Sequence, residues 1–188
     1  PFEDANIGLD LSLFGYRAIP NPDLKSETSD GFELGARRIT SSSRFNLALF
    51  DTEYDDFIES RSPIGIDETT GDLIFQSINI GTARIYGVDL GLEQDLGVWS
   101  DTLRGLTLRA TAFWAKGKNR QTDAPLNTIA PPQAVLGLSW ISPAGDWELG
   151  LASTVTAAKN TEDIDEAVIL HFATPSWFTV DFTTAWQC

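Results

Sequence analysis

Residues 77–92, SINIGTARIYGVDLGL, carry the pattern that decides the fold. From Tyr86 onward every second side chain is large and apolar, and the side chains between them are small or acidic. The apolar set is Tyr86, Val88, Leu90 and Leu92, and the other set is Gly87, Asp89, Gly91 and Glu93. A period of two places successive side chains on opposite faces of a β-strand. One strand over the whole stretch would span roughly 50 Å at about 3.3 Å per residue, which indicates the wall of a transmembrane barrel.

The same alternation recurs along the chain and predicts seven strands in all. They are expected near residues 25–39, 44–59, 77–92, 105–116, 134–141, 147–155 and 178–186. The turns near 40–43, 97–104 and 142–145 are short, whereas the connections at 61–73, 117–132 and 160–175 are long. Residues 1–23 lack a clean period and are expected to be loop. Alternating short and long connections are typical of up-and-down outer-membrane barrels, whose short turns face the periplasm and whose long loops face outward.

Composition excludes several classes of protein. The chain has 188 residues and a formal net charge of -14, which argues against a nucleic-acid-binding surface. No apolar run reaches the roughly 18 residues that a transmembrane helix needs. The single His171 and the single Cys188 cannot build a zinc or Cys/His site, and no enzyme constellation is visible. We therefore expect a protein that is not an enzyme.

A soluble all-β fold is the alternative to a membrane barrel. Alternating strands also build sandwiches and lipocalin-like barrels, so a secreted all-β binding module remains open at this point. A soluble core would have to bury charged residues beside small ones while exposing leucine and tryptophan. The charged set on the small-residue face is Asp89, Glu93, Arg109 and Asp181. Their placement favours a barrel with a polar lumen and a face toward lipid.

Three stretches resemble one family. Residues 21–28, NPDLKSET, resemble the "NPDLKPET" strand entry of TonB-dependent outer-membrane receptors, with Ser26 at the usual proline. Residues 83–90, ARIYGVDL, resemble their "a-x-I-x-G-V-E-L" strand, with Asp89 at the common glutamate. Residues 125–138 and 173–181 are similar to segments of the haemoglobin and haem branch. The resemblance covers essentially the whole chain.

The resemblance implies a transmembrane antiparallel up-and-down β-barrel of 22 strands, plugged by an N-terminal domain and located in the bacterial outer membrane. Residues 1–188 would be part of that barrel domain, without the plug and without the last strands, because the chain begins at Pro1 and contains no methionine. The expected partners are the inner-membrane TonB complex, outer-membrane lipid and the transported ligand. The implied function is uptake of iron chelates, with haem or a haem protein as the leading ligand and a ferric siderophore or another nutrient as the alternative.

No intrinsic cofactor is expected, so haem or a ferric chelate would be the transported ligand. In the haem branch a "FRAP" box precedes the "NPDL" box, often with a ligand-binding histidine between them, and residues 1–4, PFED, resemble the end of the first box. No histidine lies between Pro1 and Asn21. Tyrosinate and imidazole both ligate haem iron. Tyr16 is therefore the first candidate haem contact and His171 the second, both in connections assigned to the outside.

Overall fold

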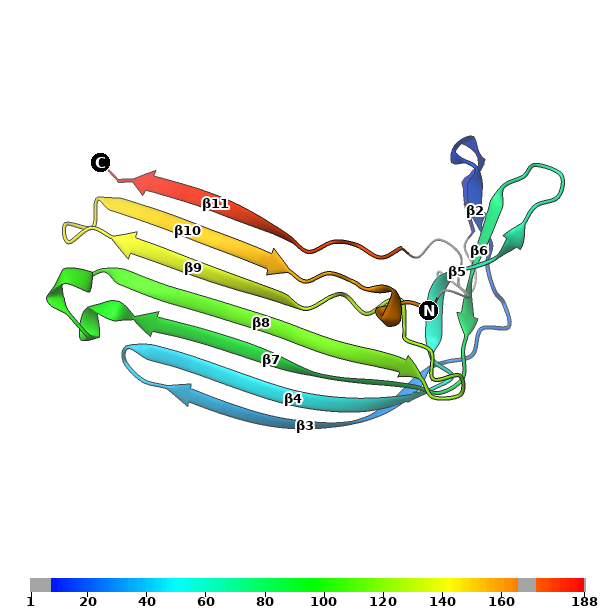
Figure 1. The fold of residues 1–188 in the computed structure, drawn as a ribbon, viewed down its shortest axis with the longest axis horizontal. Helices are drawn as coiled ribbons and strands as arrows, with labels where there is room; N and C mark the ends of the chain where they lie inside the picture. The colour runs from blue at the N-terminus through cyan, green and yellow to red at the C-terminus, as the bar shows by residue number, and fades with distance from the viewer. Residues whose placement is uncertain (1–7, 166–171, 188) are drawn as a thin grey trace.

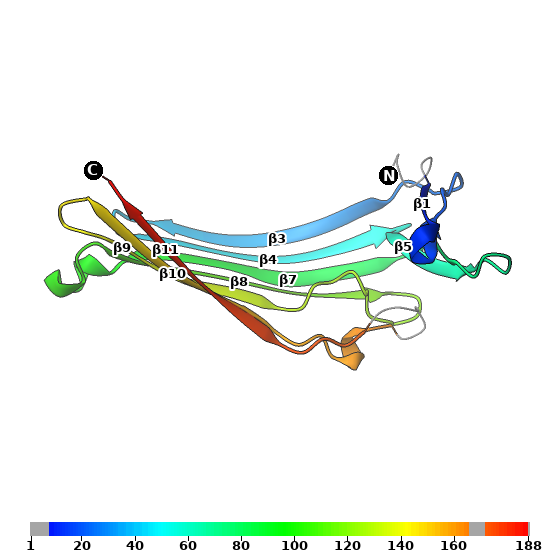
Figure 2. The ribbon, with the colours of Figure 1, turned by 90° about the horizontal axis from the view of Figure 1, so that it is seen from above.

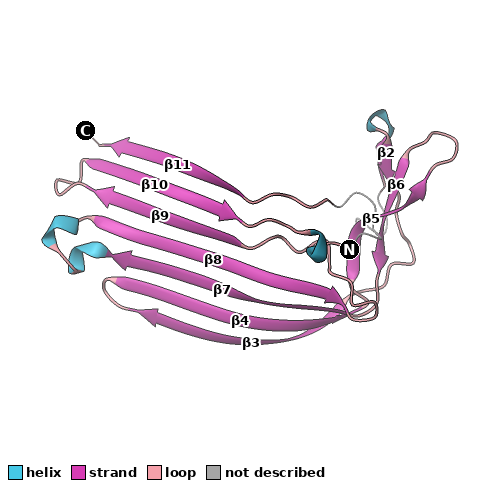
Figure 3. Cartoon of the chain, viewed as in Figure 1, coloured by secondary structure: helices cyan, strands magenta, loops and turns pink. Residues whose placement is uncertain are grey.

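The computed structural model describes residues 8–165 and 172–187, and these residues are mostly β-strand (Figure 3). The strands are β1 (Leu9–Leu11), β2 (Tyr16–Ala18), β3 (Thr28–Ile39), β4 (Ser43–Asp55), β5 (Ile58–Ile66), β6 (Leu73–Asn79), β7 (Ala83–Asp95), β8 (Leu106–Asn119), β9 (Gln133–Ile141), β10 (Trp147–Thr156) and β11 (Trp177–Trp186). Four 3-10 turns complete the described elements: η1 (Ser12–Phe14), η2 (Leu96–Val98), η3 (Asp101–Leu103) and η4 (Thr161–Asp163). None of the helical segments in this part of the chain has the length and hydropathy to cross a bilayer.

Seven strands form one antiparallel sheet in the order β11-β10-β9-β8-β7-β4-β3. The expected seven-stranded, up-and-down arrangement is therefore confirmed. In Figure 1 the tight β3–β4 and β9–β10 turns and the η2–η3 connection lie at one end of this sheet, and the long connections lie at the other. The sheet is a single curved layer (Figure 2), and its edge strands β3 and β11 have no further strand beside them among the described residues.

The strand register separates the two faces of the sheet. Cross-strand partners share a face, and Leu92 pairs with Ala110, which in turn pairs with Leu136. The residues expected to face lipid all belong to this one face: Leu90, Leu92, Leu106, Leu108, Leu136, Leu138, Leu149 and Val180. On the opposite face Glu93 accepts hydrogen bonds from Arg109 Nε at 2.9 Å and from an Arg44 guanidinium nitrogen at 3.2 Å. An apolar face and an ion-paired face are what a barrel wall needs between lipid and an aqueous lumen.

The stretch 77–92 is not one strand, and this expectation was wrong. β6 ends at Asn79 and β7 begins at Ala83, and Gly81 between them has φ +79°. An L-residue with a side chain rarely adopts that conformation, so the glycine permits the chain to leave one sheet and enter another. β6 belongs to a second sheet of four strands, in the order β1-β2-β6-β5 (Figure 1).

Two segments that were expected to be loops contain strands of this second sheet. The connection at 61–73 contains most of β5, and residues 1–23 contain β1 and β2. β5 is an edge strand whose pairing with β6 shifts register between Glu59 and Ser62 and again between Pro63 and Gly65. An edge position tolerates proline and glycine, because a missing N–H donor or side chain there interrupts no central ladder. β2 pairs in parallel with β6, which ties the N-terminal segment to the β5–β6 hairpin.

Candidate ligand-binding surface

Tyr16 lies on the second sheet, beyond the outward end of the barrel wall. Its position in β2 is set by parallel pairing with Leu73 of β6. Its ring packs edge-to-face against Phe75, with ring centroids 6.1 Å apart, and the residue remains 39% exposed. Edge-to-face packing is a preferred arrangement of aromatic pairs, so the contact with Phe75 holds the Tyr16 ring in one position. Tyr16 is therefore held in place on the second sheet and stays partly exposed.

The turn between β1 and β2 carries two exposed apolar side chains. Leu13 is 97% exposed and Phe14 is 74% exposed at the end of η1. Gly15 follows with φ +78° and its N–H donates to Ser12 O at 2.9 Å, which closes the turn. Neighbouring large apolar side chains at a loop tip are characteristic of a contact surface for protein or an apolar ligand. We call Leu13, Phe14 and Tyr16 the apolar tip.

An ion pair and backbone hydrogen bonds hold the apolar tip to the β5–β6 hairpin. Arg17 of β2 donates to the Asp67 carboxylate. Asp67 also accepts from the backbone N–H groups of Thr69 at 2.8 Å and Thr70 at 3.3 Å. These backbone donors, together with Arg17, hold the pKa of Asp67 below its usual range. The ionised carboxylate therefore joins the N-terminal segment to the tip of the hairpin.

The residues of the NPDLKSET stretch connect the second sheet to the wall. Asn21 Nδ2 donates to Ser77 O at 2.9 Å, and the Glu27 carboxylate accepts from the backbone N–H of Ile58 at 2.7 Å. Asn79 bridges the same region, because its side chain accepts from Lys25 N at 2.8 Å and donates to Asp56 O at 2.6 Å. The polar side chains of this motif thus satisfy backbone groups where the chain leaves regular pairing, and their role here is structural.

A small apolar cluster seals the junction between the wall and the outer connections. Ala83 is fully buried, and Phe57 and Leu126 are buried beside it. Tyr54 packs edge-to-face on Phe57, with centroids 5.3 Å apart. Gly117 of β8 lies under the loop that carries Leu126 and Ile129, since a Cβ atom added at Gly117 would lie 2.7 Å from a side-chain carbon of Ile129. Close packing at this point fixes the outer loops on the end of the barrel wall.

The structure places one of the two candidate haem contacts. Tyr16 is on the apolar tip, whereas His171 lies outside the described residues, so the two are not brought together here. No cluster of three or more His, Cys, Asp or Glu residues suitable for a metal ion occurs in the described part of the chain. Sequence reasoning missed Leu13 and Phe14. The sequence pattern that could have identified them is a pair of large apolar residues directly before Gly15, a turn-forming residue, in a stretch without strand periodicity.

These features define a class: the wall of an up-and-down membrane β-barrel, with a separate sheet on its outward loops. The family model described as "TonB dependent receptor-like, beta-barrel" matches residues 5–187. The chain belongs to this family. Family members are outer-membrane proteins of Gram-negative bacteria, which places the chain in the outer membrane.

Curated relatives give the same family. The hemoglobin-haptoglobin-binding protein A of Haemophilus influenzae is 30% identical over 150 residues, covering 77% of this chain and 14% of the relative. The hemoglobin-haptoglobin utilization protein B of Neisseria meningitidis serogroup C is 28% identical over 166 residues, covering 76% of this chain and 20% of the relative. The chain thus spans less than a quarter of the length of these relatives.

Solved structures show the same fold. The copper transporter OprC superposes with a TM-score of 0.72 at 22% identity, over 87% of this chain and 23% of OprC. The unliganded ferric citrate transporter FecA superposes with a TM-score of 0.64 at 16% identity, over 84% of this chain and 23% of FecA. At these identities the likeness concerns the barrel wall and its outer loops, and not the ligand.

Proposed function

We propose that the protein containing this chain is an outer-membrane receptor that takes iron from haem or a haem protein. In this proposal residues 1–188 are one part of a larger β-barrel domain that a plug domain fills, and the TonB complex supplies the energy for import. The activity is binding and transport, without a chemical reaction on the ligand. Haem is then cargo and not a resident cofactor.

The observation that supports this proposal is the apolar tip on the outward end of the wall. Leu13 and Phe14 project at a turn whose geometry Gly15 sets, and Tyr16 adds an exposed phenol beside them. Apolar and aromatic side chains are enriched where proteins contact protein partners or porphyrin-like planar ligands. The relatives named for haemoglobin and haptoglobin binding favour a haem protein over a siderophore as the ligand.

Growth on haemoglobin as the sole iron source tests the proposal. An iron-starved strain expressing the full-length receptor should grow, and a Leu13→Asp, Phe14→Asp double variant should grow poorly and bind less haemoglobin at the cell surface. Val98→Asp is the matched control, because Val98 is also exposed but lies at the opposite end of the wall. Growth on a ferric siderophore, and none on haemoglobin, would replace the haem proposal with the siderophore alternative.

Haem titration of the purified full-length receptor tests Tyr16 and His171 as iron contacts. Tyr16→Phe keeps the ring that packs on Phe75 and removes only the hydroxyl. We expect a changed haem absorption spectrum for Tyr16→Phe, because a phenolate ligand to ferric iron is lost. Unchanged spectra in both Tyr16→Phe and His171→Ala would remove both residues from the haem site.

A further inference from the structure

The second sheet has one apolar and one polar face. Tyr16 pairs with Leu11 of β1 and with Leu73 of β6, and cross-strand partners share a face. The Tyr16 ring also contacts Phe75, which confirms this arrangement for β2 and β6. The large side chains of the apolar face come from all four strands: Leu9, Leu11, Tyr16, Ile66, Leu73 and Phe75. We call these residues the Tyr16 face.

The polar face holds the second sheet together. Asp10 and Arg17 are cross-strand partners there, and Arg17 donates to the Asp67 carboxylate at the tip of the β5–β6 hairpin. Gln76 Nε2 donates to the backbone carbonyl of Pro20 at 2.8 Å. The chain itself uses these polar side chains, so the role of this face is structural. The Tyr16 face is left for contacts outside the sheet.

No strand of the wall packs extensively on the Tyr16 face in the described part of the chain. Leu9 is 53% exposed and Ile66 is 60% exposed, whereas Leu11, Leu73 and Phe75 are half-buried. The second sheet lies beyond the outward end of the wall, where the bilayer no longer covers apolar side chains (Figure 1). A contiguous apolar patch that is exposed to water marks a contact surface.

Both edges of the second sheet are unsuited to pairing with a further strand. β1 is only three residues long, and β5 carries Pro63 and two register shifts in its pairing with β6. Short edge strands, proline and bulges are devices that prevent another strand from pairing with an edge. Docking on this sheet therefore uses the side chains of the Tyr16 face rather than backbone hydrogen bonds.

The Tyr16 face has the size of the centre of a protein interface. Four strands about 4.8 Å apart, with three residues at about 3.3 Å each, give a patch of roughly 14 Å by roughly 10 Å. Stable protein complexes bury about 800 Å² on each partner, so this patch supplies only the apolar core of such an interface. Interface cores are rich in aromatic residues, here Tyr16 and Phe75, and a polar rim surrounds them.

The surroundings of the Tyr16 face are acidic. Residues 9–18 and 58–79, which form the second sheet, contain five carboxylates and two arginines. Glu68 is exposed at the hairpin tip, two residues beyond Ile66. Like charges oppose contact, so the two propionates of free haem are disfavoured, and a partner with basic residues around an apolar patch is favoured.

We propose that the Tyr16 face is the docking surface for the protein part of a haem protein, which binds through an apolar patch that basic residues surround. This inference rests on the proposed function and adds which part of the ligand the receptor recognises. The apolar patch of the partner packs on Leu9, Ile66 and their neighbours, and the acidic border attracts its basic residues. Because Tyr16 lies in the middle of the face, docking brings the partner into contact with its phenol.

Binding of haemoglobin and of haem-free globin to the purified full-length receptor tests the docking surface. Both should bind with similar affinity, because the contact is with the protein. Leu9→Ser and Ile66→Ser should each weaken both complexes about tenfold, since each removes an apolar contact from the interface core. Val98→Ser is the matched control, because Val98 is an exposed aliphatic residue at the opposite end of the wall, and it should weaken neither complex. Raising the salt from about 50 mM to about 500 mM should weaken wild-type binding several-fold.

Maleimide labelling of Ile66→Cys on intact cells tests the same surface independently of affinity. The introduced thiol should react in the free receptor and be protected by haem-free globin. The wild-type receptor is the control for labelling of Cys188. No labelling in the absence of globin would mean that another part of the receptor covers the face, and would overturn the proposal.

Other outcomes separate this inference from the proposed function. Unchanged globin binding in Leu9→Ser and Ile66→Ser, or binding that does not depend on salt, would overturn the docking surface. Binding of haemoglobin without any binding of haem-free globin would show that haem itself is the contact, so the docking surface would be rejected while the proposed function would stand. A wild-type receptor that does not bind haemoglobin would reject both.

Discussion

Replacing Leu136 by arginine measures how deeply the apolar face lies in lipid. Leu136 is in the middle of β9, is 55% exposed in the single-layer sheet, and lies four residues before Trp140. Four residues at about 3.3 Å each, tilted by roughly 40°, place it about 10 Å inside the girdle that Trp140 marks. The apolar band of such barrels is roughly 25 Å tall, so Leu136 is close to its middle.

We expect Leu136→Arg to destabilise the full-length receptor by about 3 kcal/mol, the cost of arginine near the bilayer midplane. Leu138→Arg should cost less, because Leu138 lies on the same face but only two residues from Trp140. Thr111→Arg should cost almost nothing, since Thr111 is exposed and pairs with Gly91 and Val135 on the opposite face.

Urea titration of the receptor in lipid vesicles gives these differences in the free energy of unfolding. Leu136→Ala is the matched control, because it removes the same apolar contacts without adding a charge. The order of destabilisation should be Leu136→Arg, Leu138→Arg, then Thr111→Arg. Values for Leu136→Arg and Thr111→Arg that agree within about 0.5 kcal/mol, the usual spread of neutral surface changes, would refute the assignment of the two faces.

Three further predictions follow from the junctions and edges of the fold. Since the pKa of Asp67 is lowered, its stabilising contribution is complete above its ordinary value and is lost as the pH falls below about 4. Amide protection in the β5–β6 hairpin, measured as the hydrogen-exchange rate relative to the intrinsic rate of an unstructured peptide at the same pH, should then decrease; Asp67→Asn should show the lower protection already at neutral pH. Gly81→Val should increase proteolysis between β6 and β7, because valine cannot adopt φ +79° without strain; an unchanged cleavage rate would contradict this. The 188-residue chain expressed alone should aggregate, because β3 and β11 present unpaired edges and the apolar face meets water; a soluble monomer with a cooperative thermal transition would count against the barrel wall.

The large sheet was predictable from sequence because it is one layer thick. Each residue faces either lipid or the lumen, so apolar and polar side chains alternate along each strand, as Leu90 and Leu92 do with Asp89 and Glu93. The break at Gly81 was not predicted, because Ile78 and Ile80 continue the same alternation into the second sheet. A glycine within a strand pattern signals a bend, but the sequence alone does not show which of Gly81, Gly87 and Gly91 takes a positive φ.

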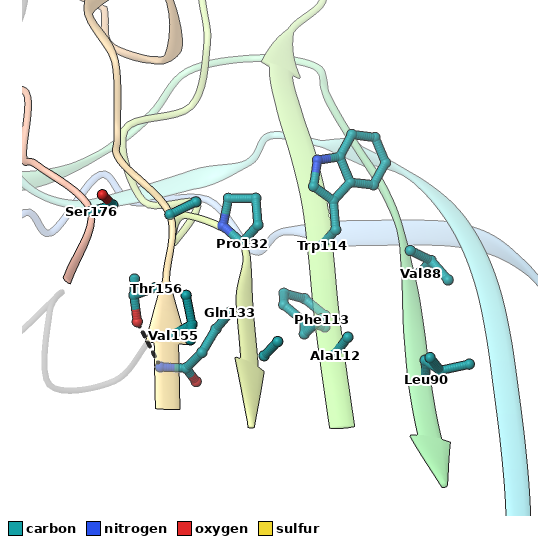
Figure 4. Close-up of a pocket in the computed structure, with 12 residues that line it drawn as sticks. Val88, Leu90, Ala112, Phe113, Trp114, Pro132, Gln133, Val155, Thr156 and Ser176 are labelled. Atoms are coloured by element: carbon teal, nitrogen blue, oxygen red, sulfur yellow. Dashed lines mark hydrogen bonds between the residues drawn. The ribbon is translucent and has the colours of Figure 1, made fainter. Parts of the chain in front are cut away.

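The functional surfaces were predictable only in part. Tyr16 could be proposed from its residue type and its place in an outward connection. Leu13 and Phe14 follow no period, so only the fold shows that they project. An apolar groove lined by Leu90, Ala112, Ala134 and Val155 (Figure 4) depends on Ala112 lying beside Ala134, and this pairing is set by the register of two strands that are joined by a long loop. Register across such a loop cannot be read from composition or spacing.

The direct pairing of β4 with β7 separates the architecture from the recognition surface. Their ladder runs from Ser43 opposite Gln94 to Tyr54 opposite Ala83, so the wall is continuous without the β5–β6 hairpin between them. Phe57 N donates to Gly81 O and Ile80 N to Phe57 O, which closes the hairpin at its base. Sequence changes, insertions or a complete exchange of residues beyond that base leave every wall hydrogen bond in place. One barrel can therefore evolve toward new extracellular ligands at little risk to its membrane assembly.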